Sequence, residues 1–310
     1  MNLSPRIVSL LPSATEIVCA LGFKDHLVGR SHECDFPAGL DHLPVCSAPR
    51  IEVDGSGREI DDEIRNIVHR GLSVYEVRED LLKSLAPDFI VTQTQCEVCA
   101  VSQKDVENTV HQWTGGQPHI VSLEPSVLDD VWSDIRHVAE LLNVRSVADR
   151  IVDVLRSRMR SIRERTAGSK ARPRVATVEW TNPLMSAGNW VPELIDMAGG
   201  ENLFGETGKH SPELQWRGLR DADPDTILVL PCGFSLDRAL EETESLSKRD
   251  GWASLKAVSD HRVYAADGHH FFNRPGPRLV ESLEIVAEIL NPGVMHFGHE
   301  GSGWRRFFSG

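Results

Sequence analysis

An apolar run turns into a helical pattern within the stretch Arg6-Ile7-Val8-Ser9-Leu10-Leu11-Pro12-Ser13-Ala14-Thr15-Glu16. Its first half predicts a buried strand, because it is rich in β-branched and leucine residues. Ser13, with Glu16 three residues later, predicts the cap of a helix that ends near Gly22. Short strands then alternate with helices as far as residue 123. This alternation predicts a parallel, doubly wound sheet.

A second half of similar pattern follows the first. Apolar residues recur every three to four positions from 126 to 166, which predicts one long helix or two abutting helices. Strands and helices alternate again beyond residue 171. We therefore predict an α/β protein with two doubly wound, Rossmann-like lobes joined by a long interlobe helix. The predicted parts are an N-terminal lobe (1–124), an interlobe backbone helix (125–170), a C-terminal lobe (171–292) and a tail (293–310).

Composition and charge restrict the kind of partner. The 310 residues include 33 Lys and Arg against 46 Asp and Glu, a formal net charge of −13. An acidic surface repels nucleic acid and anionic membranes, and no run approaches the ~18 apolar residues of a membrane span. We expect a small-molecule ligand, with no nucleic-acid partner and no membrane insertion. The first residues show no secretory leader, so we expect a cytoplasmic location, or a periplasmic or lipoprotein location if a leader was removed.

Four segments of the chain resemble the helical-backbone (class III) substrate-binding proteins of ABC importers for cobalamin, haem and ferric siderophores. They are the opening at 6–16, LKSLAPDFIV at 82–91, GGENLF at 199–204 and the last helix at 274–290. The pattern is most similar to the cobalamin-binding branch. The resemblance implies two lobes with a rigid connecting helix. It also implies a large, often metal-containing ligand in the cleft between them, and no catalysis.

The same resemblance identifies a departure on the surface. Importer-coupled members carry an acidic residue on each lobe that docks onto arginines of the transporter. Glu79 and Asp80 keep the acidity of the N-terminal lobe, whereas Arg217 occupies the matching place on the C-terminal lobe. A cation there repels an arginine pocket, which makes ordinary docking to an ABC transporter doubtful.

Three predicted loops at the carboxyl ends of strands carry metal-binding side chains. In open α/β sheets these ends face the ligand, and pockets favour domain interfaces, so we expect the loops to converge on an interlobe cleft. A Cys3His set drawn from the first two loops suits zinc or iron, and a histidine of the third suits cobalt, iron or zinc. The predicted metal ligands are His32, Cys34, Cys96, Cys99 and His269. The alternatives are packed thiols, a redox-labile cysteine pair and hydrogen-bonding loop histidines.

Aromatic and polar side chains complete the predicted site. Large flat macrocycles bury well against aromatic faces, and an arginine recognises a carboxylate or phosphate. The predicted ligand-binding residues are Pro12, Ser13, His32, Glu33, Arg50, Gln95, Trp180, Trp190, Trp216, His270, Phe271 and Arg274. For the tryptophans, the alternative is a purely structural place in the core.

The leading hypothesis is a cytoplasmic binding protein that clamps a cobalamin-like corrinoid, a tetrapyrrole or a metal chelate between its lobes. The cofactor is left open between cobalamin and a zinc or iron ion. A metal- or thiol-dependent enzyme is the first alternative, with Cys34 or Cys96 as nucleophile and His32 as base. The second alternative is an ABC-importer binding component whose export signal is missing.

Overall fold

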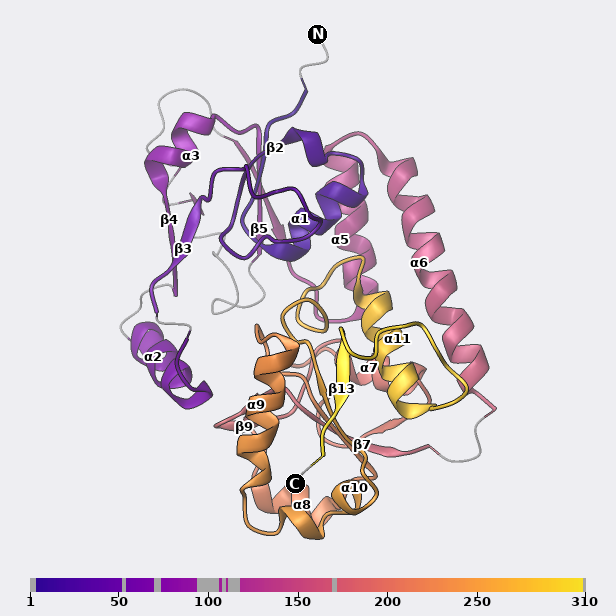
Figure 1. Ribbon diagram of the computed structural model, residues 1–310. Helices are drawn as coiled ribbons and strands as arrows, with labels where there is room; N and C mark the ends of the chain where they lie inside the picture. The colour runs from indigo at the N-terminus through magenta and orange to yellow at the C-terminus, as the bar shows by residue number, and fades with distance from the viewer. Residues whose placement is uncertain are drawn as a thin grey trace. The chain divides into compact units, whose positions relative to one another are not determined.

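The computed structural model of the chain describes residues 4–51, 54–69, 74–93, 106–107, 110, 118–168 and 172–308. The chain divides into two α/β units (Figure 1). The N-terminal unit comprises Met1–Pro125 and Asp129–Val152, and the C-terminal unit comprises Ser126–Leu128 and Asp153–Gly310. The main division falls inside helix α6 (Arg145–Thr166), so the segment predicted as a separate interlobe helix contributes to both units.

The N-terminal unit is built on a parallel sheet in the order β2-β1-β5-β6. Its central strands are buried, with apolar residues at their amino ends and the buried polar residues Ser9, Thr92 and Gln93 at their carboxyl ends. A small antiparallel pair, β3 with β4, lies beside it as a second sheet. The strands are β1 (Ile7–Ser9), β2 (Leu27–Arg30), β3 (Ser47–Pro49), β4 (Tyr75–Val77), β5 (Phe89–Gln93) and β6 (His119–Leu123). The helices of its described residues are α1 (Pro12–Ala20), η1 (Lys24–His26), α2 (Gly57–His69), α3 (Glu79–Leu85) and most of α5 (Leu128–Leu141).

The C-terminal unit has a sheet in the order β10-β7-β11-β12-β13, in which only β13 runs antiparallel. Its core is formed by apolar side chains of the central strands and the helices that cover them. The strands are β7 (Arg174–Val178), β8 (Trp180–Thr181), β9 (Leu184–Met185), β10 (Glu201–Asn202), β11 (Thr226–Val229), β12 (Val263–Ala266) and β13 (Trp304–Arg306). The helices are the rest of α6, α7 (Val191–Met197), α8 (Trp216–Ala222), α9 (Leu236–Ser247), η2 (Trp252–Ser254), α10 (Lys256–Ser259) and α11 (Leu279–Leu290). The prediction of two α/β lobes with doubly wound sheets is confirmed.

The predicted long helix after residue 126 is two helices, α5 and α6. Asn143 ends α5 in the left-handed conformation, at φ 59°, which asparagine tolerates better than most residues. The amide of Val144 then closes the turn on the carbonyl of Ala139 at 2.8 Å. Of the two alternatives that the periodicity left open, the abutting pair is the observed one.

The predicted cap at Ser13 is wrong. Helix α1 begins one residue earlier, at Pro12, and the extended residue Leu11 precedes it without a capping side chain. Proline suits the first helical position because its φ is already helical and its missing N–H needs no partner. Ser13 therefore lies inside the first turn, where it is 2% exposed and its hydroxyl finds no hydrogen-bond partner among the described residues.

The tail supplies an element that the sequence pattern does not reveal. Strand β13, yellow in Figure 1, pairs with β12, with Trp304 opposite Ala266 and Arg306 opposite Tyr264. It thereby covers an edge of the C-terminal sheet. None of the helices in the described part of the chain is long and apolar enough to cross a lipid bilayer.

Candidate functional site

The carboxyl edge of the N-terminal sheet contains a topological switch point. The chain passes from β1 to β2 on one side and from β5 to β6 on the other, so the winding reverses between β1 and β5. Open α/β sheets bind their ligands outside the carboxyl ends of the strands at this point. Pro12 and Ser13, at the start of α1, follow β1 after two residues, and Gln93 ends β5 at the same edge. The predicted site residues Gln95, Cys96 and Cys99 lie outside the described residues.

The loop after β2 holds Cys34 in a buried polar cluster. The Thr15 hydroxyl donates to its sulfur at 3.0 Å, and the Ser31 hydroxyl lies 3.2 Å from it. Cys34 is 1% exposed, and burial raises the pKa of its thiol. A metal ligand or nucleophile must be a thiolate, so this geometry favours a packed thiol over the predicted metal ligand.

His32, in the same loop, is a partly buried neutral imidazole. Its Nδ1 lies 3.0 Å from the Ser47 hydroxyl, and its ring packs against Tyr75 with centroids 5.3 Å apart. Burial, aided by the charges of Arg30 and Arg78, lowers the pKa of His32 to about 4. The ring is thus held in place and carries no charge at neutral pH.

Two further predicted residues of this unit have separate surroundings. The backbone amide of Glu33 donates to the Ser31 hydroxyl at 3.2 Å, which shapes the turn. Arg50 lines a hollow of about 350 Å³ beside α2, together with Glu63. The described residues therefore place Arg50 against a helix face formed by its own unit.

The C-terminal sheet repeats the switch-point arrangement. The chain passes from β7 to β10 on one side and from β11 to β12 on the other, so the winding reverses between β7 and β11. The amide of Cys232, which follows β11, donates to the carbonyl of Glu179, which follows β7, at 3.2 Å. The loops after β7, β11 and β12 therefore lie on one edge.

The loop after β12 fixes one of its two histidines against a carboxylate. Asp267 accepts the backbone N–H of His270 at 2.7 Å and lies 2.9 Å from its Nδ1. Burial raises the pKa of Asp267, but the hydrogen bonds from His270 outweigh it and the pKa is lowered overall. An ionised carboxylate can only accept, so the Nδ1 of His270 carries the proton and its Nε2 holds the lone pair.

The other histidine is engaged differently. Arg274, 6% exposed, donates to Nε2 of His269 at 2.9 Å. That nitrogen is the acceptor of the bond, and a guanidinium beside it repels a metal cation. Of the two histidines, His270 has the ring arrangement that could hold a metal ion, whereas the predicted ligand His269 accepts a hydrogen bond from Arg274.

The predicted aromatic wall separates into different roles. Trp190 is 4% exposed and its indole N–H donates to the Phe272 carbonyl at 2.6 Å, so it supports the β12 loop from within the core. Trp180 is partly exposed beside Phe234, with ring centroids 5.1 Å apart. Phe271, also partly exposed, lies in the β12 loop under the guanidinium of Arg278 at 4.7 Å. Trp180 and Phe271 are the aromatic side chains at the carboxyl edge that a ligand can touch.

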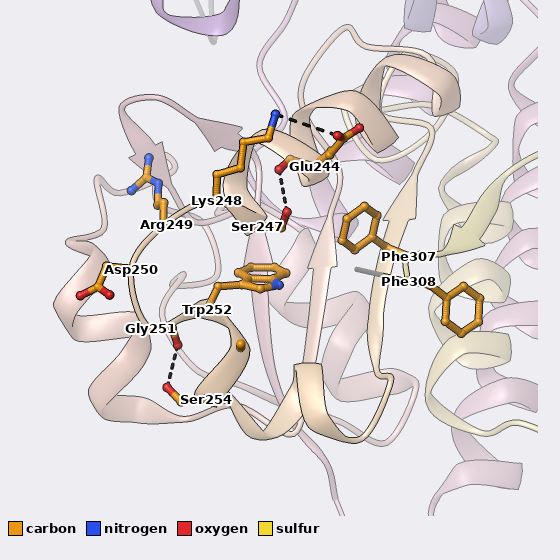
Figure 2. Close-up of a pocket in the computed structure, with 11 residues that line it drawn as sticks. Glu244, Ser247, Lys248, Arg249, Asp250, Gly251, Trp252, Ser254, Phe307 and Phe308 are labelled. Carbon is orange, nitrogen blue, oxygen red and sulfur yellow. Dashed lines mark hydrogen bonds and ion pairs between the residues drawn. The ribbon is translucent and has the colours of Figure 1, made fainter. Parts of the chain in front are cut away.

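Trp216 lies elsewhere. Its ring stacks on Trp252, with centroids 6.3 Å apart, and its indole N–H donates to the Asp250 carbonyl. Trp252 lines a hollow of about 860 Å³, which Figure 2 shows with Ser247 and Phe307 around it. The amide of Phe307 donates to the carbonyl of Val263, the first residue of β12, so this hollow lies at the amino ends of the parallel strands. It is therefore distinct from the carboxyl edge.

Glu179 is a candidate residue that the sequence reasoning missed. Its carboxyl accepts one hydrogen bond, from the Ser211 hydroxyl at 2.9 Å. Burial raises the pKa of Glu179 to about 7, against smaller lowering effects of Ser211 and His210. The signal in the sequence was its place: an acidic residue at the carboxyl end of a buried strand, directly before Trp180.

Known proteins of the same kind resemble the chain along most of its length. An uncharacterized ABC transporter substrate-binding lipoprotein of Bacillus subtilis (strain 168), YvrC, is 24% identical over 296 residues, covering 93% of this chain and 80% of the relative. A vitamin B12-binding protein of Vibrio cholerae serotype O1 (strain M66-2) is 22% identical over 298 residues, covering 92% and 88%.

Solved structures show the same fold. A periplasmic heme binding protein from Pseudomonas aeruginosa matches with a TM-score of 0.72 at 21% identity, covering 99% of each chain. The periplasmic vitamin B12 binding protein of Vibrio cholerae matches with a TM-score of 0.65 at 20% identity, covering 92% of this chain and 96% of the other. A profile of the periplasmic binding protein family matches residues 7–269. The resemblance predicted from the sequence motifs is thus confirmed, and the chain belongs to the periplasmic binding protein family.

Proposed function

We propose that this chain is a substrate-binding protein that holds a cobalamin-like corrinoid, or a tetrapyrrole or metal chelate of similar size, at the carboxyl ends of its strands. The geometry of His270 carries the proposal. Relatives named for vitamin B12 binding and structural neighbours named for heme binding support the ligand class. The predicted convergence of loops from both lobes stays a prediction.

His270 has the features of an imidazole prepared for a metal centre. Metal-binding histidines commonly donate their second ring N–H to a carboxylate, which fixes the tautomer and makes the ligating nitrogen more basic. The buried carboxylate of Asp267 does this here at 2.9 Å, while the His270 side chain stays 39% exposed. A neutral imidazole suits cobalt, iron and zinc, so His270 is the residue that would hold the metal of a bound chelate.

The surroundings of this imidazole suit a flat ligand. Phe271 follows it in the loop, and Trp180 with Phe234 stands at the end of the neighbouring strands. Aromatic faces bury a macrocycle, and a few polar groups then fix its orientation. The buried Arg274 supplies one positive charge to the same loop.

Titration of the purified protein with cyanocobalamin, hemin and a ferric chelate tests the proposal, followed by absorbance and calorimetry. We expect saturable binding of at least one of the three, with a coordination band that is lost in His270→Gln. His137→Gln, an exposed histidine of α5, is the matched control and should bind as wild type does. The absence of saturable binding by the wild type to all three ligands would overturn the proposed function. An unchanged band in His270→Gln would overturn the role of His270.

The alternative of a thiol-dependent enzyme with Cys34 as nucleophile is weakened, because the Cys34 thiol is buried and its pKa is raised.

The partner proposed for this family is an ABC transporter. The exposed Arg217 on the C-terminal unit forms an ion pair with Asp221 at 3.4 Å. We propose that this cation weakens docking of the C-terminal unit onto a basic transporter pocket. Charge reversal by Arg217→Glu would then restore the docking. The cytoplasmic location stays a prediction, which cell fractionation tests.

A further inference from the structure

The fold places Glu179 at the point where a ligand would meet the C-terminal sheet. Its amide donates to the Met185 carbonyl at 2.9 Å, and its carbonyl accepts the amide of Cys232. One residue earlier, the carbonyl of Val178 accepts the amide of Leu230 at 2.9 Å. Glu179 is therefore held by backbone bonds between β7 and β11, which is the switch point of this sheet.

One neighbouring segment positions its carboxyl. Ser211 donates its hydroxyl to Oε1 of Glu179 and accepts the amide of Gly188 at 3.1 Å. The segment packs so closely that a Cβ on Gly188 would lie 2.3 Å from the Lys209 carbonyl. The Ser211 hydroxyl is thus held between the Gly188 amide and Oε1 of Glu179. The other carboxyl oxygen of Glu179, Oε2, has no hydrogen-bond donor among the described residues.

In the part of the chain that the structure describes, no charged side chain forms an ion pair with the carboxyl of Glu179. On the segment that carries Ser211, His210 is the titratable neighbour, and Lys209 is paired with Glu206 at 2.5 Å. Further along this segment, Glu213 forms a bridge with Met185 of β9. Two charged residues reach the strand after Glu179: Glu242 of α9, which accepts the Thr181 hydroxyl, and Arg249 just beyond α9, which donates to the Thr181 carbonyl. On the β11 side the titratable residue is Cys232, whose amide donates to the Glu179 carbonyl.

We propose that Glu179 is a specificity-determining residue: as a carboxylic acid it donates a hydrogen bond to an acceptor group on the periphery of the ligand, a carboxylate or an amide carbonyl. This inference rests on the proposed function and deepens it. A carboxylate at this place would instead repel an anionic substituent. Because burial raises the pKa of Glu179 to about 7, both forms coexist near neutral pH, and affinity becomes linked to a proton.

The test compares wild type with Glu179→Gln, which is permanently neutral and nearly isosteric. The probe is hemin, which carries two carboxylates, and the affinity is measured between about pH 6 and pH 8.5. For the wild type we expect affinity to fall above neutral pH by up to about tenfold per pH unit, because only the acid form donates. In Glu179→Gln the profile should be flat over the same range. Glu241→Gln, an exposed acid of α9, is the matched control and should keep the wild-type profile.

A second measurement identifies the proton directly. Calorimetry in buffers of different ionisation enthalpy should show proton uptake on binding at about pH 8 in the wild type and less uptake in Glu179→Gln. Ser211→Ala should move the midpoint of the wild-type profile to higher pH, since it removes a bond that stabilises the carboxylate.

The outcomes separate the two proposals. If the wild type binds hemin and Glu179→Gln keeps both its pH profile and its proton uptake, the inference is overturned while the proposed function stands. If the wild type binds none of hemin, cyanocobalamin and the ferric chelate at any pH, the proposed function fails and the inference fails with it. If it binds another of these ligands but not hemin, the inference is overturned while the proposed function stands.

Discussion

Replacing Glu288 by glutamine should release the C-terminal tail from helix α11. The carboxylate is 6% exposed and accepts the amides of Phe297, Gly298 and His299 and the indole N–H of Trp304, the last at 2.8 Å. Burial raises the pKa of Glu288, but these hydrogen bonds outweigh it and the pKa is lowered overall. The tail is therefore held on α11 by hydrogen bonds from neutral donors to one ionised carboxylate.

The expected loss follows from the bonds that glutamine cannot accept. An amide keeps one acceptor oxygen but turns an N–H₂ group toward the donors on the other side, those of Trp304 and His299. Hydrogen bonds to a charged group contribute about 1.5–3 kcal/mol each, so the loss of two predicts a decrease of about 3–6 kcal/mol in the free energy of unfolding. At about 2–4 °C per kcal/mol for a unit of this size, the melting temperature should fall by about 6–24 °C.

Thermal melts and hydrogen exchange measure this effect together. The amides of Phe297 and Gly298 should exchange faster in Glu288→Gln, and β13, which begins at Trp304, should lose protection with them. Glu300→Gln, an exposed acid of the same segment, is the control and should melt as wild type does. A melting temperature within about 1 °C of wild type, with unchanged exchange of the two amides, would refute the reasoning.

Two further predictions concern the carboxyl edges. The pKa of His32 is lowered to about 4 from its ordinary 6.5, so the unfolded chain binds a proton at this ring more readily than the folded chain does. With solvent screening allowed for, the free energy of unfolding should therefore fall by about 2 kcal/mol as the pH drops from about 6.5 to about 4. Denaturant titrations should show a smaller decrease over this pH range in His32→Gln. Gly268→Ala should destabilise the C-terminal unit by about 1–3 kcal/mol, because a Cβ would lie 2.0 Å from the Pro231 carbonyl. The same variant should weaken binding of hemin, since the β12 loop would move, and unchanged stability and affinity would contradict the tight packing.

The sequence pattern predicted the elements whose own residues determine them. The pattern predicts a strand at 119–123 and helices at 236–246 and 277–290. The observed strand His119–Leu123 has the predicted bounds, and α9 (Leu236–Ser247) and α11 (Leu279–Leu290) differ from these predictions by only one or two residues at an end. Strands β3, β8 and β10 have two or three residues each, too few for any periodicity. Strands β3 and β10 exist because a distant segment pairs with them, as Val77 does with Ser47, and pairing of this kind leaves no local signal. Strand β8 pairs with the neighbouring β9.

For the candidate site, the sequence predicted the loops better than the roles of their residues. His269 and His270 are adjacent and chemically identical in the sequence, and their difference comes from Asp267 on one side and Arg274 on the other. Trp190, at the start of a helix, is predicted to contact the ligand, yet it is buried and donates its indole N–H to the Phe272 carbonyl. Such roles depend on side-chain directions, which residue spacing does not determine.

The number of hydrogen-bond donors around Glu179, Glu284 and Glu288 separates the structural acids of the C-terminal unit from the candidate functional one. Glu284 binds both Arg158 and His299, and Glu288 collects the donors of the tail, so a ligand could add little to either. Glu179 has the single donor Ser211 and a raised pKa, so its ionisation still depends on what binds beside it. Substitution by glutamine should therefore have opposite consequences at the two kinds of site: at Glu288 stability falls and ligand affinity is kept, whereas at Glu179 stability is kept or rises and the pH dependence of affinity disappears. A loss of stability at Glu179 as large as that at Glu288 would mean that the count of donors does not distinguish their roles.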